Sequence, residues 1–89
     1  MQLLYINADF DEHDLGTKIY ESIESFVQDR IGIAYSLLEL EAIASENDED
    51  EEYLDEVFVL NLLKSGSHEG EWSTEEVWLI EDGKFTQGI

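Results

Sequence analysis

Charge imbalance is the feature that most constrains this chain. Twenty-three residues are acidic and only four are basic (Lys18, Arg30, Lys64 and Lys84), which leaves a formal net charge of −19. The folded state must form against its own electrostatic repulsion, so we expect added salt to stabilise it. Binding to nucleic-acid phosphates or to anionic membranes needs clustered Lys and Arg, and the chain has too few for either.

The hydrophobic content nevertheless predicts a folded protein. Hydrophobic residues make up 43% of the 89 positions, two tryptophans and four tyrosines are among them, and there is no proline. Disordered chains of high net charge are poor in such residues. The length allows one modest core but not two, so we expect a single domain over residues 1–89.

Membrane, targeting and disulfide signals are not found. No stretch approaches the ~20 apolar residues of a membrane span. Residues 1–7 lack the basic and long apolar regions of a signal peptide. There is no cysteine, so disulfides and zinc–thiolate sites are excluded. These features favour a cytoplasmic protein.

The first third of the chain predicts a strand and a helix. Residues 2–7 are apolar on both faces of an expected strand, and 8–13 form a polar turn. Asp14 is expected to begin a helix that ends at Gly32, with Arg30 in its last turn. The helix is predicted from apolar residues at helical spacing, which are Leu15, Ile19, Ile23, Phe26 and Val27.

The middle of the chain allows two interpretations. Residues 33–45 fit a strand with Glu39 and Glu41 on one side, and they also fit a second helix. Residues 57–63 are rich in β-branched and aromatic residues on both faces, which favours a central strand. Residues 64–70 are expected to form a turn.

The last segment predicts a hairpin. Residues 71–81 have the composition of a strand, and Trp72 and Trp78 are expected to share the face that fills the core beneath the helix. The alternative is that one of them is an exposed anchor for a partner. Asp82-Gly83 is a type I′ turn signal, and residues 84–86 supply the returning strand.

These elements together predict an α+β fold. One amphipathic helix packs on an antiparallel sheet of four to five strands, in the order β-α-β-β-β-β. If residues 33–45 are helical, the order becomes β-α-α-β-β-β.

Acidic residues are densest at 46–56, where eight of eleven positions are acidic. Such a block is usually a solvated loop. However, solubility needs a net charge of magnitude only ~2–8, so the excess favours a further role. An EF-hand is excluded, because Tyr53 stands where a loop starting at Asp48 needs glycine. We expect no cofactor, and at most weak, diffuse binding of calcium or magnesium.

A partner with a basic surface explains the excess charge best. Acidic proteins are steered to cationic clefts, and the commonest deep cationic cleft is the groove of a nucleic-acid-binding enzyme. Alternate carboxylates on a strand recur about every 6.6 Å and could imitate a row of phosphates. The predicted partner-binding residues are Glu46, Asp48, Glu49, Asp50, Glu51, Glu52, Tyr53 (the candidate apolar anchor), Asp55 and Glu56, supported by Glu39, Glu41, Glu71 and Glu75.

The expected function is therefore that of an inhibitor or antagonist. It would occupy the basic groove of an enzyme or DNA-binding protein and bind no nucleic acid itself. In size and charge the chain resembles the small acidic DNA-mimic inhibitors of phages and mobile elements. Glu21-Ser22-Ile23 is also similar to a triplet in uracil-DNA glycosylase inhibitors, where it lies on a strand; here it falls in the predicted helix. The alternatives are an immunity protein or antitoxin that covers one cognate toxin, and an acidic adaptor or structural domain.

Catalysis is not expected. His13 and His68 are the residues best suited to acid–base chemistry, and both fall in predicted turns beside acids. No Gly-x-Ser-x-Gly, Gly-x-Gly-x-x-Gly or P-loop pattern occurs. A domain of this size also has little room for a deep pocket.

Overall fold

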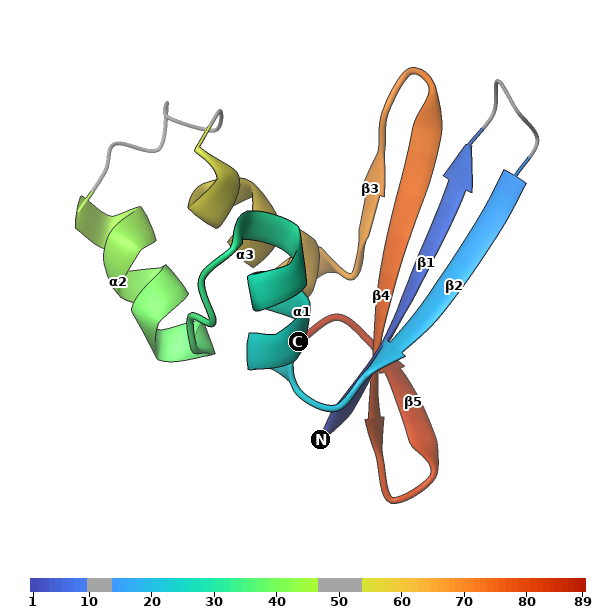
Figure 1. Cartoon of the computed structure of the whole chain (residues 1–89), viewed down its shortest axis with the longest axis horizontal. Coiled ribbons are helices and arrows are strands. Elements are labelled where there is room, and N and C mark those ends of the chain that lie inside the picture. The colour runs from blue at the N-terminus through green and yellow to red at the C-terminus, as the bar shows by residue number, and fades with distance from the viewer. Residues whose placement is uncertain (10–13, 47–53) are drawn as a thin grey trace.

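The computed structural model describes residues 1–9, 14–46 and 54–89 (Figure 1). Three helices and a five-stranded antiparallel sheet make up this part of the chain, which confirms the α+β class. The element order differs from both predicted orders. The elements are β1 (Gln2–Asp9), β2 (Asp14–Tyr20), α1 (Ile23–Ile31), α2 (Leu37–Glu46), α3 (Asp55–Ser65), β3 (Ser67–Glu69), β4 (Ser73–Glu81) and β5 (Lys84–Gln87).

Strands β1 and β4 form the centre of the sheet. They pair along the whole length of β1, from Gln2 opposite Ile80 to Asp9 opposite Ser73. β2 flanks β1, whereas the other edge of β4 pairs first with β3 and then with β5. Figure 1 shows all three helices on the same side of this sheet.

Residues 14–20 form strand β2, so the predicted helix over 14–32 begins too early. Leu15 and Ile19 are four positions apart, as a helical stripe requires, but with Thr17 they also alternate as on a strand. The segment pairs with β1 instead, with Ile19 opposite Leu4. The spacing of apolar residues in this segment fits both a helix and a strand, and the long-range pairing with β1 makes the segment a strand.

Helix α1 has a cap at each end. Ser22 has an extended backbone, and its Oγ accepts a hydrogen bond from the backbone N–H of Ser25 at 3.1 Å. Gly32 ends the helix in the left-handed conformation (φ 89°), as predicted, and its N–H donates to the carbonyl of Gln28. The Glu-Ser-Ile triplet at 21–23 is thus a helix start in this protein.

The segment 33–45, for which the sequence allows two interpretations, contains a helix, and so does the segment predicted as a central strand. Ser36 and Glu39 form a capping box for α2: each backbone N–H donates to the other's side chain, at 3.1 and 3.2 Å. The predicted strand at 57–63 is wrong, because a short apolar run has the same pattern in a buried strand and in a buried helix. The run lies in α3, where the buried side chains are Val57, Val59, Leu60, Leu62 and Leu63.

The core lies between the helices and one face of the sheet. Leu3, Val77 and Leu79 supply the sheet side. The ring of Phe26 packs against both Tyr5 and Tyr20, with 5.4 Å between centroids in each pair. The remaining core side chains come from the helices and are Val27, Leu40, Val59, Leu60, Leu62 and Leu63.

The opposite face of the sheet also carries large apolar side chains. Successive strand residues point to opposite faces, so the neighbours of the buried Leu3, Val77 and Leu79 point away from the helices. We call this surface the open face; its large apolar residues are Leu4, Ile6, Ile19, Trp78, Ile80 and Phe85. The expectation that Trp72 and Trp78 fill the core is wrong. Trp78 lies on the open face, and Trp72 precedes β4 and is 68% exposed.

Glycines lie at both ends of β5, one in the turn before the strand and one directly after it. Asp82 and Gly83 both have positive φ (52° and 75°), as the predicted type I′ turn requires. After β5, Gly88 comes so close to Gly66 that a Cβ on Gly66 would lie 2.6 Å from the Gly88 nitrogen. The N–H of Val77 donates to the Gly66 carbonyl at 2.8 Å, which ties the end of α3 to β4.

Candidate functional site

Three of the four basic side chains form ion pairs with acids of the same chain, and the fourth, Lys84, stands opposite Glu81 in the β4–β5 register. Exposed pairs of this kind contribute little to stability. Each of these contacts places a basic side chain close to an acid of the same chain instead of to a partner. The ion pairs are Lys18–Asp29 (3.3 Å), Lys64–Glu41 (3.8 Å) and Arg30–Glu75.

Three of the predicted partner-binding residues flank the segment 47–53. Glu46 ends α2, and Asp55 and Glu56 begin α3. Carboxylates in the first turn of a helix are stabilised by its dipole, so Asp55 and Glu56 suit their positions. Glu46 does not, because it adds a negative charge at the negative end of α2, whose last turn has no basic residue.

The predicted row of carboxylates formed by Glu39 and Glu41 is wrong. Residues two apart in a helix are separated by about 200° around its axis, so the two side chains point to different sides. Glu39 belongs to the capping box of α2, and the Glu41 carboxylate lies 3.8 Å from the Lys64 ammonium. Their roles are local rather than those of a phosphate-like array.

The second predicted row, Glu71 and Glu75, is also wrong. Glu71 is exposed but precedes β4. Glu75 faces the helices, is 7% exposed, and is the one buried charged residue in the described part of the chain. Glu75 therefore does not lie on the exposed surface that a partner could reach.

Glu75 is the centre of a hydrogen-bonded cluster that joins β1, β4 and α1. Its carboxylate accepts hydrogen bonds from the Tyr5 hydroxyl and the Arg30 guanidinium. Arg30 also donates to the Tyr5 hydroxyl at 3.0 Å, and the Asn7 amide donates to it at 3.4 Å. The cluster replaces apolar packing at this point of the core face.

The cluster keeps Glu75 ionised. Burial alone raises the pKa of Glu75, but the hydrogen bonds from Arg30 and Tyr5 and the charge of Arg30 outweigh it, so the pKa lies below its ordinary value. Burial and the hydrogen bond to Glu75 raise the pKa of Tyr5. A carboxylate with such partners acts as a structural ion pair.

A second cluster joins β2 to α1. The Tyr20 hydroxyl donates to the Asp29 carboxylate at 2.5 Å, and the Lys18 ammonium lies 3.3 Å from the same oxygen. Burial and this hydrogen bond raise the pKa of Tyr20 to about 12. The hydrogen bonds from Tyr20 and Lys18 lower the pKa of Asp29.

The six residues at the middle of the acidic run lie outside the described residues, as does His13. Those six predicted partner-binding residues are Asp48, Glu49, Asp50, Glu51, Glu52 and Tyr53.

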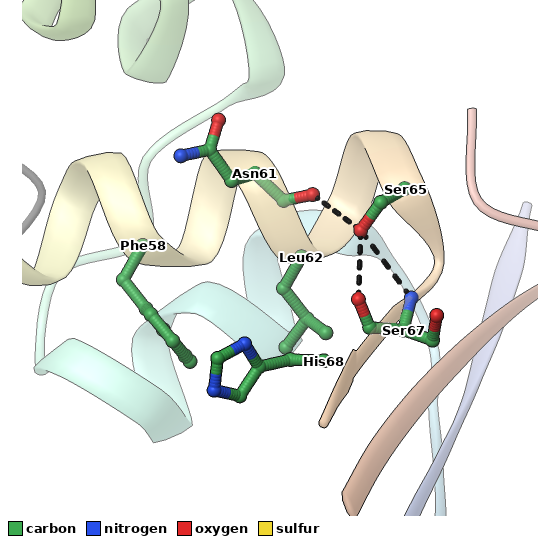
Figure 2. Close-up of a pocket in the computed structure, with 6 residues that line it drawn as sticks. All are labelled: Phe58, Asn61, Leu62, Ser65, Ser67 and His68. Atoms are coloured by element: carbon green, nitrogen blue, oxygen red, sulfur yellow. Dashed lines mark hydrogen bonds between the residues drawn. The ribbon is translucent and has the colours of Figure 1, made fainter. Parts of the chain in front are cut away.

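A pocket of about 200 Å³ lies between α3 and β3 and includes His68 (Figure 2). The His68 ring packs edge-on against Phe58, with 4.9 Å between centroids. The Ser65 hydroxyl lies 2.9 Å from the carbonyl of Asn61 and 2.8 Å from that of Ser67, so it stabilises the turn from α3 into β3. The predicted turn at 64–70 thus contains β3, and its histidine is held by an aromatic neighbour.

Residues 1–9, 14–46 and 54–89 contain neither a metal-binding cluster nor a membrane-spanning helix. No group of three or more His, Asp or Glu in these ranges is placed to hold a metal ion. No helix in these ranges is long and apolar enough to cross a membrane.

The open face is the surface that sequence reasoning missed. Its signal is the apolar character of β1 at consecutive positions, where a strand with one solvated face would alternate with polar residues. Comparison with known proteins does not assign this surface or the acidic one: no family model, no curated protein and no solved structure matches the chain.

Proposed function

We propose that this protein is an acidic antagonist that binds the basic nucleic-acid-binding groove of an enzyme or DNA-binding protein and blocks it. The observation that carries the proposal is the internal pairing of the basic side chains. Three of the four cations are in ion pairs within the chain and Lys84 stands opposite Glu81 in register, so the cations are already beside acids while the chain keeps a net charge of −19 that a basic partner would balance.

Glu46 supports a binding role for the surface at the end of α2 and the start of α3. A carboxylate at a helix C-terminus costs about 0.3–1 kcal/mol, so helix stability does not explain it. Glu46 and Asp55 are both exposed and flank the most acidic stretch of the chain. We assign this surface to the cationic groove, with Glu56 beside it.

The mechanism follows from long-range electrostatics. A cationic groove attracts a −19 protein from a distance and so raises the association rate, as it does for its nucleic acid. The bound antagonist meets the Lys and Arg side chains that would otherwise contact phosphates. Binding should therefore weaken as salt concentration rises, and nucleic acid should compete with it.

The proposal is tested by capture from a host lysate with the pure protein as bait. The expected result is retention of a nucleic-acid-binding protein at low salt, its elution at high salt, and its displacement by added DNA. Retention that is indifferent to both salt and DNA would contradict the proposal.

A matched pair of variants locates the surface. Glu46→Lys with Asp55→Lys changes the charge at the proposed surface by four units. Glu21→Lys with Glu24→Lys makes the same total change elsewhere, and Glu24 matches Asp55 because both lie in the first turn of a helix. The first pair should slow association with the captured protein by about tenfold more than the second. Equal slowing would mean that net charge alone acts and that the assigned surface is wrong.

A second candidate is an immunity protein or antitoxin that covers one cognate toxin. The open face favours it, because a single dedicated partner is contacted partly through apolar residues. This candidate predicts retention of one protein that DNA does not displace.

A further inference from the structure

We propose that the open face is a docking surface for a basic protein whose own apolar patch is bordered by Lys or Arg. The inference rests on the proposed function for one point, the positive charge of the partner. Its location on the molecule, on the far side of the sheet from the helices, is independent of the acidic surface at the end of α2.

The first argument is the apolar content of this face. Leu4 stands between Ile19 and Trp78 in register, and Ile80 stands beside Phe85. Ile19 and Phe85 are 60% and 57% exposed. None of the open-face side chains belongs to the core cluster or packs against it. Contiguous apolar side chains of this kind on an otherwise highly charged protein mark an interaction surface.

The second argument is the sign of charge on the same face. Glu76 lies within it, opposite Ile6 on one side and Ser67 on the other. Glu69 has the same orientation on β3, because it is two residues from Ser67. Because side chains alternate along a strand, Lys18 and Lys84 point to the helix side of the sheet. Arg30 and Lys64 are on helices. The open face therefore combines apolar groups with carboxylates and contains none of the four cations.

Charge complementarity selects the occupant. A second copy of the chain would bring Glu76 and Glu69 against the same acids, with none of the four cations between them, and would oppose two charges of −19. A partner with Lys or Arg around an apolar patch would cover Leu4, Trp78 and Ile80 and would also neutralise the two glutamates. The helices already cover the other face in this layered way, and the partner would add the missing layer.

Trp78 provides a direct probe. The chain has two tryptophans, so Trp72→Phe leaves Trp78 as the single tryptophan, placed on the open face. The titrant is a synthetic amphipathic helix of Leu and Lys, with its leucines on one side and its lysines at the border. The control titrant has the same residues in scrambled order, and hence the same charge. We expect a blue shift of Trp78 emission with the amphipathic peptide and a much weaker response to the scrambled one.

Matched substitutions test the location. Ile19→Thr with Phe85→Thr removes apolar groups from the open face at positions exposed enough to leave the fold intact. Ile33→Thr with Leu38→Gln removes two apolar groups of similar exposure (53% and 77%) outside the sheet. We expect the first pair to raise Kd by about tenfold or more, which corresponds to ~1.4 kcal/mol. The second pair should change it by less than about twofold.

Three results would overturn the inference. They are equal binding of the scrambled peptide, equal effects of the two variant pairs, and a concentration-dependent dimer in sedimentation that the Ile19 and Phe85 substitutions abolish. Failure of the proposed function is a different result: the Glu46 and Asp55 reversals then have no special effect on the captured protein. The two surfaces are thus tested separately.

Discussion

Leu3 and Leu4 are neighbours in the chain, identical in type, and belong to different surfaces of the sheet. Leu3 is fully buried under the helices, whereas Leu4 lies on the open face between Ile19 and Trp78. Glu75 and Glu76 repeat the contrast on β4. Glu75 is buried and paired with Arg30, and Glu76 lies among the apolar residues of the open face.

The contrast separates residues that fold this protein from residues left for binding. On the helix side each residue type has a stabilising partner: leucines meet helix side chains, and the buried acid meets a cation. On the open face, leucine and glutamate have only other residues of that face as neighbours. The amino-acid composition therefore reflects both folding and binding. The alternation of side chains along each strand places the two groups of residues on opposite faces of the sheet.

The largest predicted effect compares the two leucines. Leu3→Ala should lower the free energy of unfolding by about 2–5 kcal/mol, because it leaves a cavity in a closed core. Leu4→Ala should cost about 1 kcal/mol or less, because Leu4 has no helix above it. Chemical denaturation of both variants measures the difference, and equal losses would show that the open face is part of the stabilising core.

The next effect compares the two glutamates. Glu75→Gln should cost about 1–3 kcal/mol at neutral pH, because it breaks a buried charged hydrogen-bond cluster. Glu76→Gln should change stability by less than about 0.5 kcal/mol.

The pH dependence of the Glu75 effect has a defined sign. The pKa of Glu75 is lower in the folded protein than the ordinary value of 4.5, so its stabilising contribution is present above that value and is lost as pH falls through the folded pKa. The stability gap between the wild type and Glu75→Gln should therefore narrow below about pH 4.5. Urea titrations at several pH values measure it; a gap that widens on acidification would contradict the assignment.

The smallest effect concerns Tyr20, whose neighbour Ile19 lies on the open face. Because the pKa of Tyr20 is raised to about 12, its contribution to stability is present below pH 10 and is lost as pH rises through 12. Tyr20→Phe should remove one tyrosine from the component of the alkaline absorbance titration near pH 12. Ile19→Thr should leave that component unchanged, and its loss in this control would point to general unfolding instead.

The sequence contained enough information for the class and for local signals. Gly32 as a helix end, Asp82-Gly83 as a turn, and the strands near both ends of the chain depend on neighbouring residues and were predictable. Ser36 and Glu39, three apart, also form a capping box, and this signal could have settled the helical interpretation of 33–45.

The sequence-based predictions were wrong where contacts between residues far apart in the chain determine the structure. Residues 14–20 join β1 rather than α1, and the apolar run at 57–63 forms a buried helix rather than a central strand. In the candidate site, Glu75 could not be separated from the exposed acids, because its burial depends on Arg30 and Tyr5, 45 and 70 positions away. The consecutive apolar residues of β1 indicate two apolar faces, but which face stays open depends on where three helices pack, and no local pattern specifies that.

The pairing of β1 with β4 has a consequence for how the chain folds. The two central strands come from opposite ends of the chain, so the sheet's centre cannot assemble until the two ends of the segment between them have been brought together. The β1–β2 hairpin can form early, but the long loop must then close against the repulsion of its own carboxylates. Folding should therefore be rate-limited by this closure, and counterions should speed it by screening the charges that have to be gathered.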